Sequence, residues 1–97
     1  MVQLVRPAQA GTLESNDIMI TVAPGEAGSG VVLELNSLVM AQYGAAIRQT
    51  IADTVTARGV ADIYIKAIDR GALDCTIRAR LLAALARAGV IGEEVPV

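Results

Sequence analysis

The chain has 97 residues, of which 54% are hydrophobic and 19% are charged, so it is long enough and apolar enough to fold around one core. Its net charge is −2 and only 2% of its residues are aromatic, which argues against nucleic-acid binding through basic stripes or base stacking. It contains no His, the side chain that most often performs acid–base catalysis near neutral pH. We therefore expect residues 1–97 to form a single domain that is not an enzyme by itself.

Cysteine usage and the N-terminal sequence bear on the compartment. Cys75 is the only cysteine and cannot form an internal disulfide, which fits a reducing environment. Near the N-terminus, Arg6 follows the apolar residues instead of preceding them, unlike the order in a secretory signal peptide. The longest apolar runs are far shorter than a membrane span. The sequence therefore predicts a cytoplasmic protein with no membrane partner.

The first part of the chain predicts a β-hairpin. We expect residues 1–7 to be a short N-terminal arm and residues 8–14 to be an extended segment of small residues. Residues 15–17 (Ser-Asn-Asp) supply turn chemistry, because Asn tolerates positive φ while Ser and Asp hydrogen-bond the local backbone. Residues 18–23 then alternate apolar side chains with period two, as a half-buried strand does. This arrangement places Ser15 at the tip of the hairpin.

A glycine-rich loop at residues 24–30 separates the hairpin from a third strand at residues 31–36. A phosphate-binding loop opens directly into a helix, whereas this loop opens into a strand whose Val31, Leu33 and Leu35 alternate inward. We therefore interpret residues 24–30 as a plain hairpin loop and not as a phosphate cradle.

Two amphipathic helices are predicted in the second half of the chain. The first begins after Ser37, a favourable N-cap residue, and extends over residues 38–58 until Gly59 ends it. Its apolar residues recur every four positions and are Val39, Tyr43, Ile47, Ile51 and Val55. The second helix extends over residues 72–88 and ends at Gly89. Its buried stripe is expected to consist of Leu73, Ile77, Leu81 and Leu85.

The remaining segments complete the predicted fold. Residues 60–68 predict a strand between the helices, with Ile63, Ile65 and Ala67 on one face, and residues 90–97 are expected to be a short C-terminal tail. The element order is therefore β-β-β-α-β-α. This order indicates an α+β fold, a two-layer sandwich in which two helices cover one face of a mostly antiparallel four-stranded sheet.

Ser15 is the leading candidate for a functional residue. The other two serines have structural explanations, since Ser29 lies in the glycine-rich loop and Ser37 is the expected N-cap. No neighbouring base is available to activate the Ser15 hydroxyl, so nucleophilic catalysis by this residue is not expected. A serine that a separate enzyme modifies needs no such base, and a loop tip accommodates an attached group with little loss of packing. The alternative interpretation is that Ser15 only forms the turn.

Other polar residues receive a structural interpretation first. Cys75 is expected to be a small core residue, with a reactive thiol near a helix N-terminus as the alternative. Glu14 and Asp17 flank the serine, and two isolated carboxylates are expected to be solvated and not to form a metal site. Three arginines give the second helix basic flanks: Arg78, Arg80 and Arg87. We expect these to be solvated, with docking of a phosphate-rich arm or an acidic surface as the alternative.

Several motifs together resemble one known family. They are Gly-Thr-Leu-Glu-Ser-Asn-Asp at residues 11–17, Asn-Ser-Leu-Val at 36–39, Gln-Tyr-Gly-Ala-Ala-Ile at 42–47, Arg-Gly-Ala-Leu-Asp-Cys at 70–75 and Arg-Ala-Arg at 78–80. In this order and at this spacing they are similar to the citrate lyase acyl carrier (gamma) subunit. The departures are Asn16, where the family more often has Gly or Ser, and Arg70, where it has Lys.

The resemblance implies a role for Ser15. In that family the serine after Gly-Thr-Leu-Glu carries 2'-(5''-phosphoribosyl)-3'-dephospho-CoA through a phosphodiester, attached by a prosthetic-group transferase. The thiol of this group holds acetyl or citryl thioesters. The α subunit exchanges acetyl for citrate, and the β subunit cleaves the citryl thioester to oxaloacetate. The chain would then be a non-catalytic carrier whose benefit is a high effective concentration of substrate.

Two alternative functions stay open at this point. The related malonate decarboxylase carrier holds a similar group on a serine, although its serine lies in a sequence less like residues 11–17. The other alternative is a small scaffold or regulatory protein in which Ser15 is a plain turn residue or is phosphorylated. The genes adjacent to this one would separate these functions, because a carrier is expected beside lyase and transferase genes.

Overall fold

The structure, a computed structural model, describes residues 2–92. Residues 93–97 of the expected C-terminal tail lie outside the described part. The elements in chain order are β1 (Val2–Leu4), β2 (Ala8–Gly11), β3 (Ile18–Pro24), β4 (Val31–Ser37), α1 (Met40–Ala57), β5 (Ile63–Asp69), α2 (Asp74–Ala88) and β6 (Val90–Gly92). Within residues 2–92, neither helix combines the length and the apolar character needed to cross a membrane.

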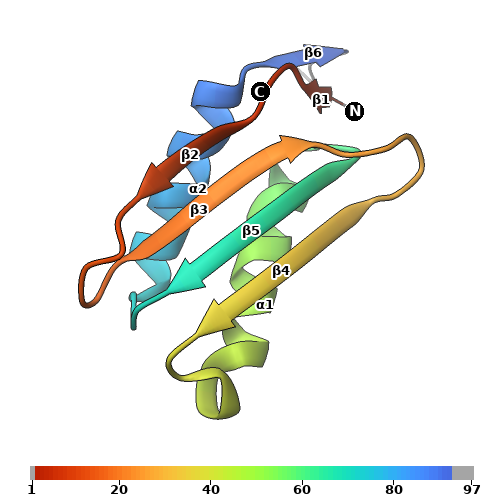
Figure 1. The fold of residues 1–97 in the computed structure, drawn as a ribbon. Coiled ribbons are helices and arrows are strands. Elements are labelled where there is room, and N and C mark those ends of the chain that lie inside the picture. Colours follow the sequence, from red (N-terminus) through yellow and green to blue (C-terminus); the bar gives the residue numbers. More distant parts are fainter. Residues whose placement is uncertain (1, 93–97) are drawn as a thin grey trace.

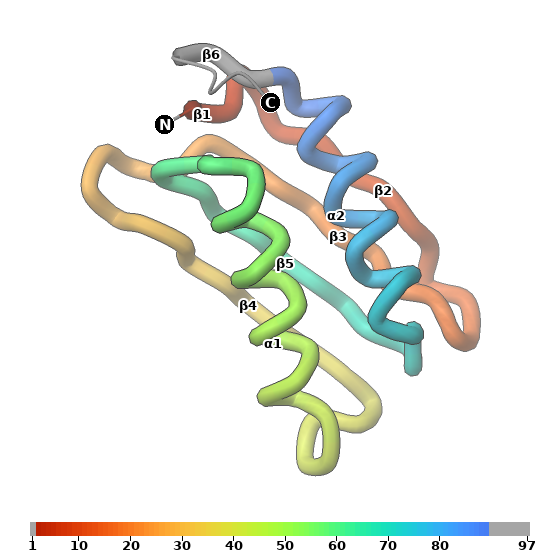
Figure 2. Tube along the Cα trace, turned by 180° about the vertical axis from the view of Figure 1, so that it is seen from behind, coloured from red at the N-terminus to blue at the C-terminus, as the bar shows by residue number. Residues whose placement is uncertain are grey.

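Two layers form the body of the protein. The main sheet has the strand order β2-β3-β5-β4, and α1 and α2 lie side by side on one of its faces (Figures 1 and 2). The pairs β2–β3 and β3–β5 are antiparallel, whereas β4 runs parallel to β5. The predicted fold class is therefore confirmed, with one parallel pair at the edge of a mostly antiparallel sheet.

The loop between β3 and β4 is not the predicted hairpin loop, because β5 lies between these two strands. Both ends of this loop instead bind Asp62, the residue just before β5. The Gly25 amide donates to the Asp62 carbonyl at 3.2 Å, and the Gly30 amide donates to the Asp62 carboxylate at 2.9 Å. Alternating apolar residues show which face of a strand is buried, but they do not show which strand is its neighbour.

A second, two-stranded sheet lies at one end of the molecule. β1, within the expected N-terminal arm, pairs antiparallel with β6 of the expected tail (Figure 1). The side chains of Val2 and Leu4 are buried, and the Val2 backbone bonds Gly59 and Ala61 at 3.0 and 2.9 Å. Burial of these two apolar side chains gives a physical reason for the pairing, which three-residue strands do not reveal by pattern alone.

The core is aliphatic and lies between the sheet and the helices. The apolar residues of the main sheet that are fully shielded from solvent are Ile18, Ile20, Val22, Ile63, Ile65 and Ala67, and Ala10 of β2 is buried as well. The helices contribute Ile47, Ile51, Val55, Ile77, Leu81, Ala84, Leu85 and Ala88. The predicted alternation of β3 and β5 is thus confirmed. In β4, which is an edge strand, Leu33 and Leu35 are only half-buried and Val31 is exposed.

The starts of both helices differ from the prediction. Val39, not Ser37, is the N-cap residue of α1, and Tyr43 is 56% exposed because the first turns of α1 extend beyond the end of the sheet (Figure 1). Leu73 is the N-cap residue of α2 and is 71% exposed, so its place in the predicted buried stripe was wrong. Cys75 follows in the first turn and is exposed, so it is not a core residue.

Candidate functional site

Three connections meet at the end of the sheet that carries Ser15. They are residues 12–17 between β2 and β3, residues 38–39 between β4 and α1, and residues 70–73 between β5 and α2 (Figure 1). The strand register brings them together, because Ile18 and Ser37 both pair with Asp69, the last residue of β5. The two helices begin at this same end of the molecule.

Ser15 is exposed at the tip of its loop. The next residue, Asn16, has a φ of 64°, a conformation that Asn adopts more readily than most residues. The Asp17 amide donates to the Glu14 carbonyl at 3.2 Å, which closes the turn around Ser15. The Asn16 amide donates to the Arg70 carbonyl at 2.8 Å and ties the turn to the next connection. Among residues 2–92, no hydrogen-bond partner of the Ser15 hydroxyl is found, so this group faces solvent.

The carboxylate of Asp17 organises the base of the loop. It is buried, and it accepts hydrogen bonds from the Thr12 hydroxyl at 2.7 Å and from the Ile18 amide at 2.7 Å. Arg80 of α2 donates to both of its oxygens, from Nε at 3.0 Å and from Nη2 at 3.3 Å. A guanidinium that contacts both oxygens of a carboxylate fixes geometry as well as charge. The loop is therefore attached at its base to α2, while its tip stays exposed.

A second aspartate supports the neighbouring connections. Asp69 is buried and accepts hydrogen bonds from the Ser37 hydroxyl at 2.8 Å and from the amides of Gly71 and Ala72 at 3.2 and 3.0 Å. Its backbone carbonyl accepts from Leu38 at 3.4 Å. These hydrogen bonds fix the two connections beside the Ser15 loop, residues 38–39 and residues 70–73.

Comparison with known proteins identifies the kind of molecule to which this loop belongs. A family model described as "ACP: Malonate decarboxylase delta subunit (MdcD)" matches residues 5–88. The citrate lyase acyl carrier protein of Streptococcus equi subsp. equi is 53% identical over 81 residues, covering 84% of this chain and 78% of that protein. The chain belongs to the citrate lyase acyl carrier family. A more distant member from Halothermothrix orenii is 46% identical over 93 residues, or 96% of this chain and 97% of that protein.

The fold agrees with this assignment. A solved Pseudomonas malonate decarboxylase hetero-tetramer in complex with malonate contains a chain that matches with a TM-score of 0.74 and 20% identity, covering 90% of this carrier and 88% of that chain. At this identity the match concerns the fold alone. A member of the family is a carrier subunit of a multi-subunit complex and not its catalyst. Acyl carrier identity also implies a covalently attached prosthetic group.

The other charged candidate residues make contacts that the sequence analysis did not predict. Asp17 was expected to be solvated, and this was wrong, because its carboxylate is buried and pairs with Arg80, whereas Glu14 is exposed as expected. Arg80 was expected to be solvated; its side chain is 43% exposed, but its guanidinium binds Asp17, which the prediction did not include. Arg87 donates to the Gln9 carbonyl at 2.8 Å, so it too has a bond to the sheet. No sequence signal identifies the Asp17–Arg80 pair, since the two residues are 63 positions apart.

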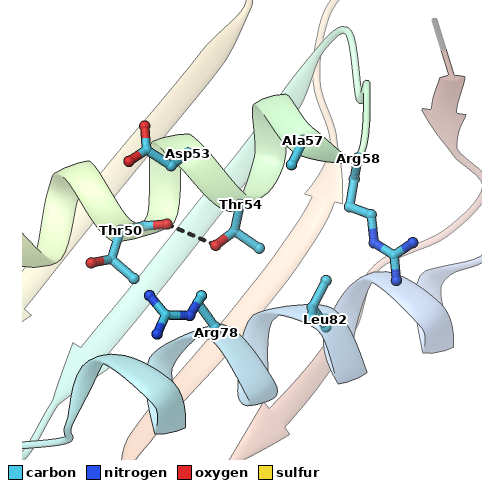
Figure 3. A pocket seen from close by; sticks show the side chains of 7 residues that line it. All are labelled: Thr50, Asp53, Thr54, Ala57, Arg58, Arg78 and Leu82. Carbon is cyan, nitrogen blue, oxygen red and sulfur yellow. Dashed lines mark hydrogen bonds between the residues drawn. The ribbon is translucent and has the colours of Figure 1, made fainter.

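A hollow of about 450 Å³ lies between α1 and α2 (Figure 3). It is lined by Thr50, Asp53, Thr54, Ala57, Arg58, Arg78 and Leu82. The Thr54 hydroxyl is engaged, because it donates to the Thr50 carbonyl at 2.8 Å. Since no residue of the Ser15 loop lines this hollow, we place the candidate site at the loop and not between the helices.

The charge on Asp17 leads to a prediction about acid stability. The hydrogen bond from Arg80 lowers the pKa of Asp17 from 3.8 to about 2, helped by Thr12 and the Ile18 amide and opposed by burial. A carboxyl group whose pKa is lowered by folding stabilises the folded state. This stabilisation is fully present at pH values above the unfolded-state pKa, about 4, and is lost as the pH falls toward the folded-state pKa, about 2. Because Arg80 is 43% exposed, we expect this contribution to be only about 1–2 kcal/mol.

Urea unfolding of the wild-type chain and of Asp17→Asn at pH 5 and pH 2 measures this contribution. The wild-type chain should be more stable than Asp17→Asn at pH 5, and the difference should shrink at pH 2, where Asp17 is protonated in about half of the folded wild-type molecules. The remaining carboxylates are shared by both chains, so their effects cancel in the difference. A difference that stayed constant between the two pH values would contradict the assignment.

Proposed function

We propose that Ser15 carries the prosthetic group of this acyl carrier, phosphoribosyl-dephospho-CoA, through a phosphodiester. The observation that supports this proposal best is the exposed serine at the tip of a loop whose base is held by the partly buried ion pair of Asp17 and Arg80. Serine provides the hydroxyl oxygen that a phosphodiester requires. The neighbouring side chains of Leu13 and Glu14 are exposed as well, so a bulky group meets no packed surface at this position.

The chain's part in catalysis is then to hold and present the attached group. When bound, the group would supply a thiol that carries acetyl or citryl as a thioester. Bond making and breaking belong to the α and β subunits of citrate lyase, and attachment belongs to a prosthetic-group transferase. In this proposal residues 1–97 act as one carrier domain in the cytoplasm.

Intact-mass and peptide mass spectrometry tests this proposal. The purified chain is incubated with the transferase and the activated prosthetic group, and an adduct of one group per chain is expected on the peptide that contains Ser15. An adduct on another residue would show that the attachment site is wrong. A chain that stays unmodified while the same enzyme loads a known citrate lyase carrier would contradict the proposed function.

The carrier of a malonate decarboxylase is the second candidate function. The description of the matching family model favours it, while the relatives at 46–53% identity favour citrate lyase. The loaded chain separates the two candidates when it is offered to the catalytic subunits of each enzyme. Restoration of citrate cleavage supports the first function, and restoration of malonate decarboxylation supports the second.

A further inference from the structure

We infer that the Asp17–Arg80 pair is a positioning device, which holds the Ser15 loop in the shape that the prosthetic-group transferase accepts and thereby sets the rate of attachment. This inference rests on the proposed function, since it concerns attachment at Ser15. Neither residue is expected to touch the reacting atoms. Their role is to act through the loop, from its base to its tip.

The Ser15 loop has few contacts other than those of Asp17 that fix its conformation. Residues 12–16 are all exposed, so apolar packing contributes little to their conformation. Apart from backbone bonds and the Glu14 amide, which donates to the Thr12 hydroxyl at 3.2 Å, the side-chain hydrogen bonds of this segment converge on the Asp17 carboxylate. This carboxylate accepts from Thr12 at the start of the loop and from Ile18 after its end. A loop with few buried contacts samples several conformations unless specific bonds select one of them. Asp17 supplies these bonds.

Arg80 connects that carboxylate to a rigid part of the molecule. It lies on α2 between positions that pack on the sheet, and the neighbouring side chains of Ile77 and Leu81 are fully buried. Its Nε and Nη2 groups contact different oxygens of Asp17, so the carboxylate cannot rotate without breaking a bond. The orientation of the loop is therefore fixed by its contact with α2 as well as by the two strands that it connects, β2 and β3.

The attachment reaction needs this orientation. The Ser15 Oγ–H bond breaks, an Oγ–P bond forms, and the bond between phosphorus and the leaving phosphate of a phosphoanhydride donor breaks, with the electron pair departing on that leaving group. The proton passes to a base that the transferase supplies, since this chain has no His and, among residues 2–92, no hydrogen bond joins the Ser15 hydroxyl to the neighbouring Glu14 carboxylate. Displacement at phosphorus requires the attacking and leaving oxygens to lie roughly in line. A serine displaced by about 1 Å therefore reacts much more slowly.

Substitution of Arg80 tests the inference. Arg80→Gln removes the charge, Arg80→Lys keeps the charge but not the two-pronged contact, and Arg78→Gln is the matched control on the exposed side of the same helix. Initial rates of attachment are measured by mass spectrometry over a range of carrier concentrations, at a temperature where circular dichroism shows each chain to be folded. We expect kcat/KM for Arg80→Gln to fall by about 10- to 100-fold. Arg80→Lys should lie between Arg80→Gln and wild type, and Arg78→Gln should match wild type.

A second readout distinguishes positioning from a general loss of structure. In Arg80→Gln, amide hydrogen exchange should accelerate at Asn16 and Arg70, whose amides join the loop to the next connection, but not at Ile77 within α2. Equal attachment rates for wild type and Arg80→Gln would overturn the inference while leaving the proposed function intact. An equal loss of rate in Arg78→Gln would overturn it as well. If the wild-type chain itself were not loaded, the proposed function would fail and the inference with it.

Discussion

Replacing Ser15 by alanine is expected to abolish prosthetic-group attachment completely while leaving the fold unchanged. The substitution removes the one oxygen that the phosphodiester requires, and no other loop side chain between Leu13 and Asn16 offers a hydroxyl. Because Ser15 is exposed, its loss should change the free energy of unfolding by less than about 1 kcal/mol. Intact mass after incubation with transferase and donor measures the first effect, and a urea titration measures the second.

Ser29→Ala is the matched control for this experiment. Ser29 is also an exposed loop serine, but it lies in the connection between β3 and β4, at the opposite end of the sheet. This variant should be loaded like the wild-type chain. A Ser15→Ala chain that still gained the full mass of the group, or that still supported citrate cleavage with the partner subunits, would disprove the attachment site.

The local features of the site could be predicted from the sequence because they depend on neighbouring residues. The turn chemistry of Ser15, Asn16 and Asp17 indicated a hairpin tip, and Asn16 indeed has a positive φ. The period-two pattern also identified the buried faces of β3 and β5 correctly, since side-chain direction in a strand alternates whatever its neighbours are.

The features that depend on distant residues could not be predicted in this way. The insertion of β5 between β3 and β4 is set by which strands bury surface together, and apolar alternation is the same in either order. The contact between the Ser15 loop and α2 also depends on residues that are far apart in the sequence. In the sequence, Asp17 and Arg80 each look like ordinary surface charges. In the structure, Arg80 Nε lies 3.0 Å from Asp17 Oδ1.

The end of a helical pattern is a third case, and Leu73 illustrates it. A leucine four positions before Ile77 continues the apolar period, so the sequence predicted a buried residue. In the structure Leu73 is the N-cap of α2, where the backbone has left the helical path, with φ −73° and ψ 158°. Periodicity applies only to residues inside the helix, so a stripe drawn through its first residue overestimates the core.

Replacing Leu81 by alanine is expected to have the largest effect on stability. Leu81 lies in the middle of α2, its side chain is fully buried, and it packs in the aliphatic cluster between helix and sheet. Truncation removes apolar contacts and leaves a cavity that the surrounding branched side chains fill only in part, which costs about 2–5 kcal/mol. The core has no Phe or Trp that could shift to occupy the space. The midpoint of urea unfolding should therefore fall strongly.

Leu73→Ala gives the matched comparison, because it makes the same chemical change eight residues earlier on a side chain that is 71% exposed. Its free energy of unfolding should stay within about 0.5 kcal/mol of wild type. The two variants together test which face of α2 is buried, independently of any assay of Ser15. Equal destabilisation by both substitutions would mean that α2 begins earlier and packs over a longer stripe. A mild effect of Leu81→Ala alone would mean that this helix turns a different face to the sheet.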